Sequence, residues 1–189
     1  MIMKHIILAS NSPRRRELLA GLDLEFEVKV LPDIDESYPK DLPVAEVAGY
    51  ISREKADSYR ALIGEDDLVI TADTVVIVGN EVLGKPKDAD EARCMLHLIS
   101  GRTHQVITGV CLLTTVKEHS FSVTTDVTFK QLSDDEITYY IEHYKPFDKA
   151  GAYGIQEWIG YIGVTSINGS YFNVMGLPVQ RLWEEIKKI

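Results

Sequence analysis

The chain has few cysteines, few cations and no long apolar run, and each shortage excludes a class of protein. Its two cysteines, Cys94 and Cys111, are too few for a disulfide framework or a four-ligand metal site. Both stand in apolar stretches, which predicts buried free thiols and a reducing compartment. The apolar run at residues 6–9 is too short for a signal peptide or a membrane span. We therefore expect a cytoplasmic protein with no membrane partner.

Basic residues are outnumbered, with 20 Lys and Arg against 29 Asp and Glu and a formal net charge of −9. A surface that binds a nucleic-acid polymer needs a basic stripe, so the acidic balance argues against such a partner. It still permits one small polyanion in a local basic pocket. The hydrophobic fraction of 45% is that of an ordinary globular protein, and 189 residues can bury a core as one domain or as two lobes sharing a sheet.

Strand and helix patterns alternate along the chain, which predicts an α/β fold with about six helices around a mixed sheet. The predicted strands cover residues 6–9, 26–30, 68–72, 75–78, 81–83, 106–116, 121–129, 153–155 and 161–167. The clearest predicted helices cover residues 13–22, 43–59, 88–101, 133–144 and 178–188. Three helix starts carry capping signals: Ser12 precedes Pro13, Asp88 caps the helix 88–101, and Ser133 with Glu136 fits a capping box.

The segment 9–16 places hydroxyl groups and arginines where a strand leads into a helix. Free backbone N–H groups at a helix start attract anions, and Ser10 and Ser12 add hydroxyl donors. Arg14 and Arg15 can bind phosphate through two parallel hydrogen bonds each. A solvated first turn with ordinary capping explains the pattern equally well, although a cation there opposes the helix dipole by about 0.3–1 kcal/mol.

Four carboxylates stand in two places: Asp33, Asp35 and Glu36 in one polar loop, and Asp73 after an apolar run. We expect Asp73 just past a strand end, where α/β sheets bind ligands. Two carboxylates from separate segments suit Mg²⁺, which leaves its other positions to water and phosphate. A turn-forming aspartate in a solvated acidic loop is the alternative, and it is favoured for Asp33. The five histidines lack metal-ligand spacing, so His104 is interpreted as structural.

Three isolated lysines, Lys55, Lys85 and Lys149, could each neutralise a polyphosphate, although a single lysine is more often a surface residue. Two glycines among small residues in segment 147–156 indicate a close approach of the backbone to a neighbour. Gln156 at its end offers a donor and an acceptor side by side, which matches the N3–H and O4 groups of uracil or thymine. A glycine-rich strand crossing with a surface glutamine is the alternative.

Taken in order, these segments resemble the Maf family of nucleoside triphosphate pyrophosphatases. The matching segments are residues 9–15, 17–19, 35–36, 53–56, 72–76, 84–86, 100–104, 148–156, 168–171 and 176–178. Segment 148–156 is similar to the branch that acts on dTTP and UTP rather than to the branch that acts on 7-methyl-GTP. Glu157 and Trp158 depart from the family pattern, which usually has glycine after the glutamine.

The resemblance implies an α/β fold of the Maf/inosine-triphosphatase-like type, an elongated mixed sheet with flanking helices and a deep cleft between two lobes. It implies a single domain over residues 1–189 whose lobes share the central sheet. It also implies a cytoplasmic, often dimeric enzyme that takes a nucleoside triphosphate and needs Mg²⁺ or another divalent cation such as Mn²⁺.

Site residues carry over from the family by position. Asp73 is the implied general base, and Glu36 and Asp73 are the implied metal ligands. The positions that handle phosphate and metal are Ser10, Arg15, Glu36, Lys55 and Lys85. The positions that set base specificity are Arg14, Thr74 and Gln156.

The implied reaction is hydrolysis of the α–β phosphoanhydride of dTTP or UTP, and of modified pyrimidine triphosphates, to the monophosphate and pyrophosphate. In it, Asp73 would deprotonate a water for in-line attack on the α-phosphorus. Two alternatives remain open. The first is a nucleotide-binding regulator of cell division or septum formation without significant turnover. The second is a purine or 7-methyl-GTP pyrophosphatase.

Overall fold

A computed structural model describes residues 4–189, which form seven strands in one mixed sheet with helices around it. The strands are β1 (His5–Leu8), β2 (Phe26–Val28), β3 (Asp67–Val78), β4 (Glu81–Leu83), β5 (Thr103–Leu113), β6 (Glu118–Phe129) and β7 (Val164–Asn168). Their order is β2-β1-β3-β5-β6-β7, with β4 paired to β3. Strand β1 is parallel to both β2 and β3, whereas the pairs β3–β4 and β6–β7 are antiparallel, so the predicted mixed α/β sheet is confirmed.

Seven α-helices and two 3₁₀ turns complete the described chain. The helices are α1 (Pro13–Ala20), α2 (Val47–Asp57), α3 (Ala89–Ile99), α4 (Asp134–Tyr144), α5 (Trp158–Gly163), α6 (Tyr171–Met175) and α7 (Val179–Ile186). The 3₁₀ turns are Val44–Glu46 and Ala150–Ala152. Among residues 4–189, no helix is both long and apolar enough to cross a membrane.

The chain divides into two compact units. The first unit comprises Met1–Asp73, Thr108–Val123 and Gly176–Ile189, and the second comprises Thr74–Ile107 and Thr124–Met175. Strands β3, β5 and β6 each contribute residues to both units. The single domain with two lobes and the cleft between them stay predictions.

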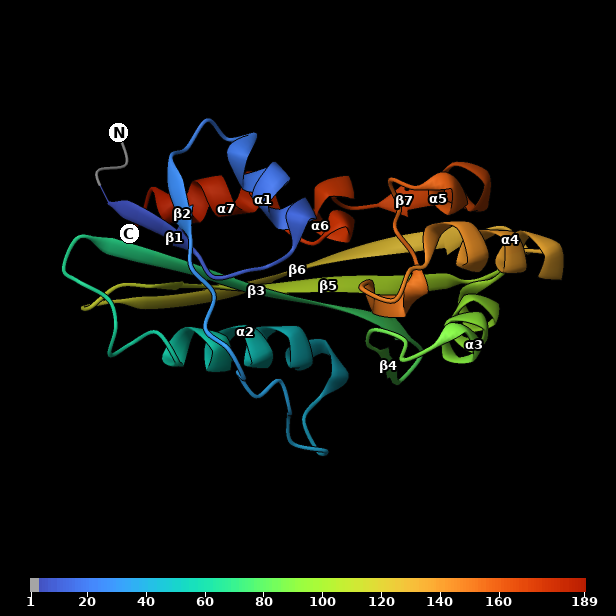
Figure 1. Ribbon diagram of the computed structural model, residues 1–189, viewed down its shortest axis with the longest axis horizontal. Helices are drawn as coiled ribbons and strands as arrows, with labels where there is room; N and C mark the ends of the chain where they lie inside the picture. The colour runs from blue at the N-terminus through green and yellow to red at the C-terminus, as the bar shows by residue number, and fades with distance from the viewer. Residues whose placement is uncertain (1–3) are drawn as a thin grey trace. The chain divides into compact units, whose positions relative to one another are not determined.

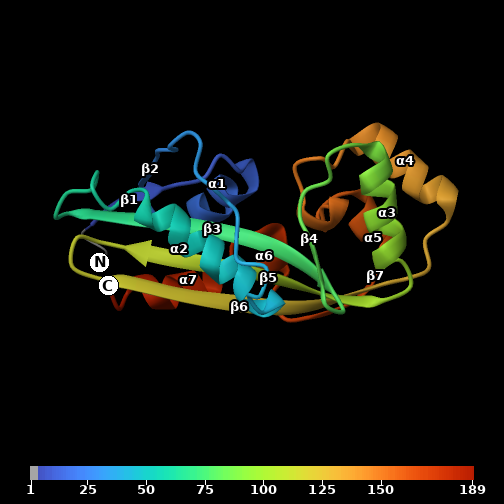
Figure 2. The ribbon, with the colours of Figure 1, turned by 90° about the horizontal axis from the view of Figure 1, so that it is seen from below.

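In the first unit, helices lie on both faces of the strands. Helices α1 and α7 cover one face and α2 covers the other (Figures 1 and 2). A buried cluster in this unit consists of Ile7, Ala56, Tyr59, Val69, Cys111 and Leu113. Cys111 is therefore a buried free thiol, as predicted, and burial raises its pKa to about 11.

Helix α2 approaches strand β5 closely, and this approach depends on Gly109. A Cβ atom at Gly109 would lie 2.4 Å from the backbone of Ala48 and Gly49, inside any van der Waals contact. Only glycine therefore allows α2 to lie directly on this strand. Gly109 thus brings the first turn of α2, the helix that also carries Lys55, close to the sheet.

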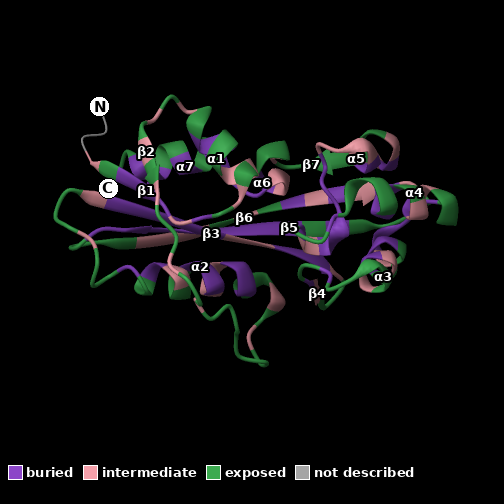
Figure 3. Ribbon diagram, in the orientation of Figure 1, coloured by how far each residue is buried: buried purple, intermediate pink, exposed green. Residues whose placement is uncertain are grey.

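The second unit has its own core, formed where α3 and α4 pack with α5 on the strands. Its buried cluster is Val76, Leu83, Ala92, Met95, Leu96, Ile99, Val106, Val127, Phe129, Leu132, Ile137, Tyr140, Ile141, Ala152, Tyr153, Ile155 and Ile159. Buried residues concentrate along β3 and β5 (Figure 3). Cys94 is exposed, so its predicted burial is wrong: it lies between the buried turns of α3, whose inward positions are Ala92 and Met95.

Local cap signals were reliable. The side chain of Ser12 accepts from the Arg15 amide at the start of α1, and Ser133 and Glu136 form the predicted capping box at the start of α4. Asp88 caps α3 as predicted. The strand expected at residues 153–155 is absent from the described structure.

The strand expected at residues 161–167 is only partly correct, because residues up to Gly163 belong to helix α5 and only Val164–Asn168 forms β7. Aromatic and β-branched residues in this stretch favour a strand locally. Packing reverses that preference: Ile159 is fully buried, and a Cβ atom at Gly160 would lie 1.9 Å from the carbonyl oxygen of Ile155. The tight turn before α5 thus explains the error.

Candidate functional site

Asp73 lies within strand β3 rather than beyond its end. The apolar runs on either side of it form one continuous strand, Asp67–Val78, so the expected strand end at Asp73 is wrong. Asp73 and Thr74, although polar, continue the strand between the residues that pair with β1 and those that pair with β4. The side chain of Asp73 is 14% exposed, and a carboxylate so enclosed needs a partner.

That partner is Lys55 on helix α2. Its Nζ lies 2.8 Å from Oδ1 of Asp73 and 2.9 Å from Oε1 of Glu36, which comes from the loop after β2. The side chain of Lys55 is 12% exposed, whereas that of Glu36 is 53% exposed. One ammonium thus joins two carboxylates from separate segments, and the group Glu36–Lys55–Asp73 carries one net negative charge.

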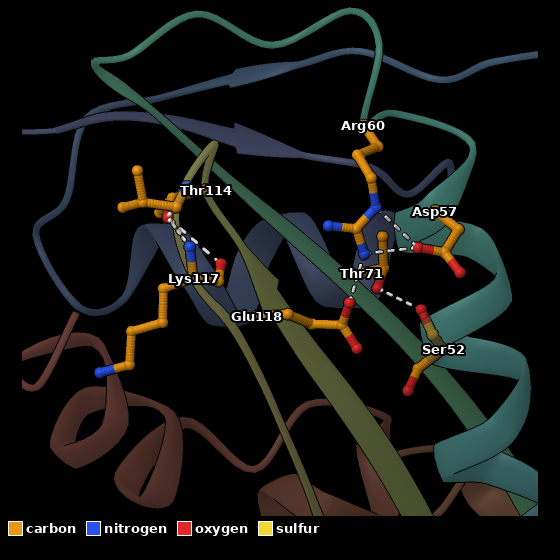
Figure 4. Close-up of polar contacts among 8 residues, drawn as sticks. Ser52, Asp57, Arg60, Thr71, Thr114, Lys117 and Glu118 are labelled. Carbon is orange, nitrogen blue, oxygen red and sulfur yellow. Dashed lines mark hydrogen bonds and ion pairs between the residues drawn. The ribbon is translucent and has the colours of Figure 1, made fainter.

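The face of α2 that carries Lys55 is anchored on β3 by a second contact. The hydroxyl of Thr71 donates to the carbonyl of Ser52 at 2.6 Å, two strand residues before Asp73 and three helix residues before Lys55 (Figure 4). Because alternate residues share one side of a strand, the Thr71 bond and the Asp73 ion pair lie on the same side of β3. The two contacts together fix the position of Lys55 along the strand.

The C-terminal end of α2 is held by charges. Arg60, just past the helix, donates to Asp57 at 2.6 Å and also bonds Glu118 on β6 (Figure 4). The turn between β5 and β6 closes nearby, where the amide of Thr114 donates to the carbonyl of Lys117 at 2.8 Å (Figure 4). The predicted strand 106–116 therefore extends too far, because β5 ends at Leu113 and β6 begins at Glu118.

Arg15 directs its guanidinium to backbone carbonyls. Its Nε donates to the carbonyl of Gly176 at 2.8 Å, and its Nη1 donates to the carbonyl of Ala72 at 2.9 Å. Burial lowers the pKa of Arg15, and the nearby Asp73 carboxylate partly offsets this effect. The residue therefore connects helix α1 to the backbone immediately before Asp73 and to the segment that leads into α7.

The loop before α1 brings hydroxyl groups next to β3. Ser10 is buried, and its Oγ accepts from the amide of Ser12 at 3.2 Å. The Oγ of Ser12 in turn accepts from the amide of Arg15 at 3.4 Å. Arg14 lies beside Arg15, since its charge further lowers the pKa of Arg15. The first unit thus brings Arg15, Glu36, Lys55 and Asp73 into mutual electrostatic range.

In the acidic loop, Asp35 forms a local turn. Both oxygens of Asp35 accept from Ser37, at 2.8 Å from its amide and 2.8 Å from its hydroxyl, and these bonds lower the pKa of Asp35. This is the turn-forming role that Asp residues commonly take. Among residues 4–189, no group of three or more His, Cys, Asp or Glu side chains could hold a metal ion.

In the second unit, Lys85 lies on an exposed loop beside segment 149–156. The carbonyl of Gly84 accepts from the amide of Gly151 at 3.0 Å. Gly151 has φ of +67°, and a Cβ atom there would lie 2.8 Å from Cγ2 of Val76. Thr74 precedes Val76 by two residues, so segment 149–156 packs on the side of β3 that carries Thr74.

Gln156, the last residue of that segment, has a side-chain hydrogen-bond acceptor without a partner in the described structure. Its Oε1 is buried and has no hydrogen-bond partner within the part of the chain that the structure describes. A buried acceptor without a partner costs about 1–3 kcal/mol, so the arrangement favours a ligand donor at this position. Thr74, Lys85 and Gln156 all belong to the second unit.

His104 has the structural role that its sequence context predicts. It is 1% exposed, and its Nε2 is hydrogen-bonded to the hydroxyl of Tyr153 at 2.7 Å. Burial lowers the pKa of His104 to about 4, which keeps the ring neutral. The aromatic ring of Phe129 packs against both residues.

Sequence reasoning missed Gly176 and the pair Tyr140–Glu157. Gly176 supplies the carbonyl for Arg15, and a backbone acceptor leaves no trace in residue type. Tyr140 bonds Glu157, and the unusual glutamate after Gln156 was the one available hint of this contact. Lys149, one of the three isolated lysines, is buried and pairs with Glu157 at 3.1 Å.

A family model described as Maf-like protein matches residues 5–189. A dTTP/UTP pyrophosphatase of Phocaeicola vulgatus is 62% identical over 184 residues, which cover 97% of this chain and 95% of that protein. A dTTP/UTP pyrophosphatase of Bacteroides thetaiotaomicron is 58% identical over 184 residues, with the same coverage of 97% and 95%. A dTTP/UTP pyrophosphatase of Flavobacterium psychrophilum is 51% identical over 178 residues, covering 94% of this chain and 91% of that protein.

Two solved structures have a similar fold. A HAM1 protein from Coxiella burnetii matches with a TM-score of 0.52 and 15% identity, covering 99% of this chain and 100% of that chain. The Ham1 protein of Staphylococcus aureus matches with a TM-score of 0.50 and 15% identity, covering 67% and 72% of the two chains. At this level of identity the similarity concerns the fold alone.

Proposed function

Because this chain belongs to the Maf family, we propose that it hydrolyses dTTP and UTP to the monophosphate and pyrophosphate. The observation that carries the proposal is the Glu36–Lys55–Asp73 group, in which one ammonium joins two carboxylates within 2.9 Å. Curated relatives named dTTP/UTP pyrophosphatase are 62% and 58% identical across 97% of the chain, which supports the substrate class.

The carboxylates of this group fit a divalent cation. Glu36 and Asp73 already share one cationic partner, so both can reach a single positive ion. Mg²⁺ binds through one or two carboxylates plus substrate phosphate and water, and Mn²⁺ accepts similar oxygen ligands. We propose Glu36 and Asp73 as the residues that would hold it. When bound, such a cation would neutralise phosphate charge and acidify a water.

The chain's own residues supply the rest of the reaction. Asp73 would take the proton from the attacking water, and Lys55 would orient its carboxylate. Arg14, Lys55 and Lys85 would offset the charge on the departing pyrophosphate, mainly by position and electrostatics. Ser10 and Arg15 belong to the same proposal as phosphate-handling residues. The contacts of Arg15 with two backbone carbonyls indicate that it also holds the backbone before Asp73 in place.

Base recognition is proposed for Gln156, with Thr74 and Arg14. The buried Oε1 of Gln156 could accept the N3–H of uracil or thymine, and its Nε2 could donate to O4. Cytosine presents an acceptor at N3 and a donor at N4, so the same amide orientation would reject it. The proposal therefore predicts that UTP and dTTP are preferred over CTP.

A substrate panel tests the function directly. The protein is incubated with Mg²⁺ and dTTP, UTP, CTP, GTP, ITP or 7-methyl-GTP, and the products are separated by anion exchange. Monophosphate plus pyrophosphate from dTTP and UTP supports the proposal. Preference for a purine triphosphate would reassign the substrate, orthophosphate would indicate another phosphatase, and binding without turnover would indicate a nucleotide-binding regulator.

We also propose a cytoplasmic location and a homodimer, on the strength of the family resemblance. The net charge of −9 supports a single nucleotide rather than a nucleic-acid polymer as the ligand. Light scattering of the purified protein tests the homodimer, because a monomer mass of 21.2 kDa would contradict it.

A further inference from the structure

A polar cluster surrounds Gly154 in the second unit, and it consists of Tyr140, Lys149 and Glu157. The hydroxyl of Tyr140 accepts from the amide of Gly154 at 3.0 Å and donates to Oε2 of Glu157. The Nζ of Lys149 lies 3.1 Å from Oε1 of the same carboxylate. Both oxygens of Glu157 therefore have partners, and through Tyr140 they are tied to the backbone of the loop. We call this group the Tyr140 cluster.

The Tyr140 cluster is enclosed. Tyr140 is completely buried, and the side chains of Lys149 and Glu157 are 9% and 21% exposed. Lys149 also contacts Asp148, whose side chain is 58% exposed, at 2.8 Å. An enclosed ion pair whose carboxylate has a partner on each oxygen is held in place, because removing one charged partner leaves the other buried without compensation.

Gln156 lies against this cluster. A Cβ atom at Gly154 would lie 3.0 Å from Cδ of Glu157, 3.0 Å from Cε of Lys149 and 3.1 Å from Nε2 of Gln156. Three side chains therefore converge near one point above the glycine, where the amide nitrogen of Gln156 lies close to both Glu157 and Lys149. The Oε1 atom of Gln156 is buried and has no partner among residues 4–189.

The orientation of this carboxamide decides which base it can read. With Oε1 toward the ligand it accepts from N3–H of uracil or thymine, and after a 180° flip it would instead suit cytosine. A fixed carboxylate attracts the amide N–H groups and repels the amide oxygen, so its position selects one of the two orientations.

We propose that Tyr140, Lys149 and Glu157 are positioning residues that hold the Gln156 carboxamide with its oxygen toward the base. They thereby set the preference for uracil and thymine over cytosine. This inference rests on the proposed function, in which Gln156 contacts the base.

Two variants test the proposal, Glu157→Gln and Tyr140→Phe. Each keeps the side-chain volume and removes a charge or a hydroxyl from the cluster. We expect the ratio of kcat/KM for UTP over CTP to fall about tenfold in each, the equivalent of one lost hydrogen bond, mostly through KM. Circular dichroism and Tm test whether each variant is folded. If Tyr140→Phe does not fold, Glu157→Gln alone tests the proposal.

Matched controls come from the same helix. Tyr144 stacks on Tyr140 one turn away and is 38% exposed, so Tyr144→Phe removes a hydroxyl outside the loop. Glu142 is exposed on α4, and Glu142→Gln removes one charge there. Both should leave the UTP over CTP ratio within about twofold. An equal fall in the controls, or no fall in either cluster variant, overturns the proposal.

A double variant separates positioning from general support of the loop. In Gln156→Ala, the base preference should disappear, and adding Glu157→Gln should then change the ratio no further. Additive effects would overturn the proposal. Titrations with UMP and CMP measure the base preference without turnover. If the protein prefers UMP over CMP but hydrolyses no triphosphate, the proposed function fails. The same titrations on the cluster variants then still test this inference. No preference between UMP and CMP in the unmodified protein would overturn it.

Discussion

Lys55 and Asp73 form an ion pair with a distance of 2.8 Å between Nζ and Oδ1, at the middle of strand β3. Both side chains are less than 15% exposed, so the pair is largely removed from solvent. Enclosed pairs of this kind lose most when one partner is removed, because the other charge stays buried without compensation. Here the remaining charge would be a carboxylate that already faces Glu36 across the same ammonium.

Lys55→Met should therefore lower turnover strongly. Without the ammonium, Asp73 and Glu36 repel each other, and the carboxylate of Asp73 loses its fixed orientation. We expect kcat for UTP to fall about 10²-fold or more, as for the loss of one preorganised charged group. Pyrophosphate release with saturating UTP measures it. Lys29→Met, at an exposed lysine of the same unit, should change kcat less than twofold, and an active Lys55→Met protein would contradict the assigned site.

Asp73→Asn tests the proposed base separately from nucleotide binding. The amide keeps the volume and can still accept from Lys55, but it cannot take a proton from water. We expect kcat to fall about 10²–10⁴-fold, the usual contribution of a positioned general base, while the Kd for UTP changes only a few-fold. Isothermal titration gives the Kd, and single-turnover kinetics give the rate. Asp66→Asn, an exposed carboxylate just before β3, serves as the control; near-normal turnover in Asp73→Asn would rule out the proposed role.

Much of the fold could be predicted from local signals. Helix starts at Ser12, Asp88 and Ser133 were correct because capping is decided by a few neighbouring residues. Helix α5 was missed because its six residues favour a strand locally, and only the packing of Ile159 and the close contact of Gly160 with Ile155 make it helical. Such tertiary contacts are invisible in a short window of sequence.

The site was harder to predict than the fold. Glu36, Lys55 and Asp73 come from three separate segments, and composition or spacing could not bring them together; the family resemblance did. The contacts of Arg15 were not predicted, since its partners are the carbonyls of Ala72 and Gly176 and every residue has a carbonyl. The residue type of Arg15 therefore predicted phosphate binding but not its hydrogen bonds to the backbone.

Arg15→Lys separates the charge of Arg15 from its two carbonyl contacts. Lysine keeps the positive charge, but a single ammonium cannot reach both carbonyls with the geometry of a guanidinium. We expect the free energy of unfolding to fall by about 2 kcal/mol, because buried acceptors lose their donors. Urea denaturation followed by tryptophan fluorescence measures it. Arg16→Lys, at the next and exposed residue of α1, should change the stability by less than about 0.5 kcal/mol, and an equal loss in both variants would contradict this role.

His104 predicts a pH dependence of stability with a defined direction. Its pKa is about 4 in the folded protein against an ordinary value of 6.5, so between these pH values the unfolded chain binds the extra proton. The free energy of unfolding should therefore fall as the pH drops from 6.5 to 4, by about 3 kcal/mol from this group, with no further loss from it below pH 4. Urea titrations at several pH values measure this slope. His104→Gln, which can still bond the hydroxyl of Tyr153, should lack this acid-induced loss, so its stability relative to the unmodified protein should rise by about 3 kcal/mol between pH 6.5 and pH 4. A constant difference across the range would show that His104 does not titrate this way.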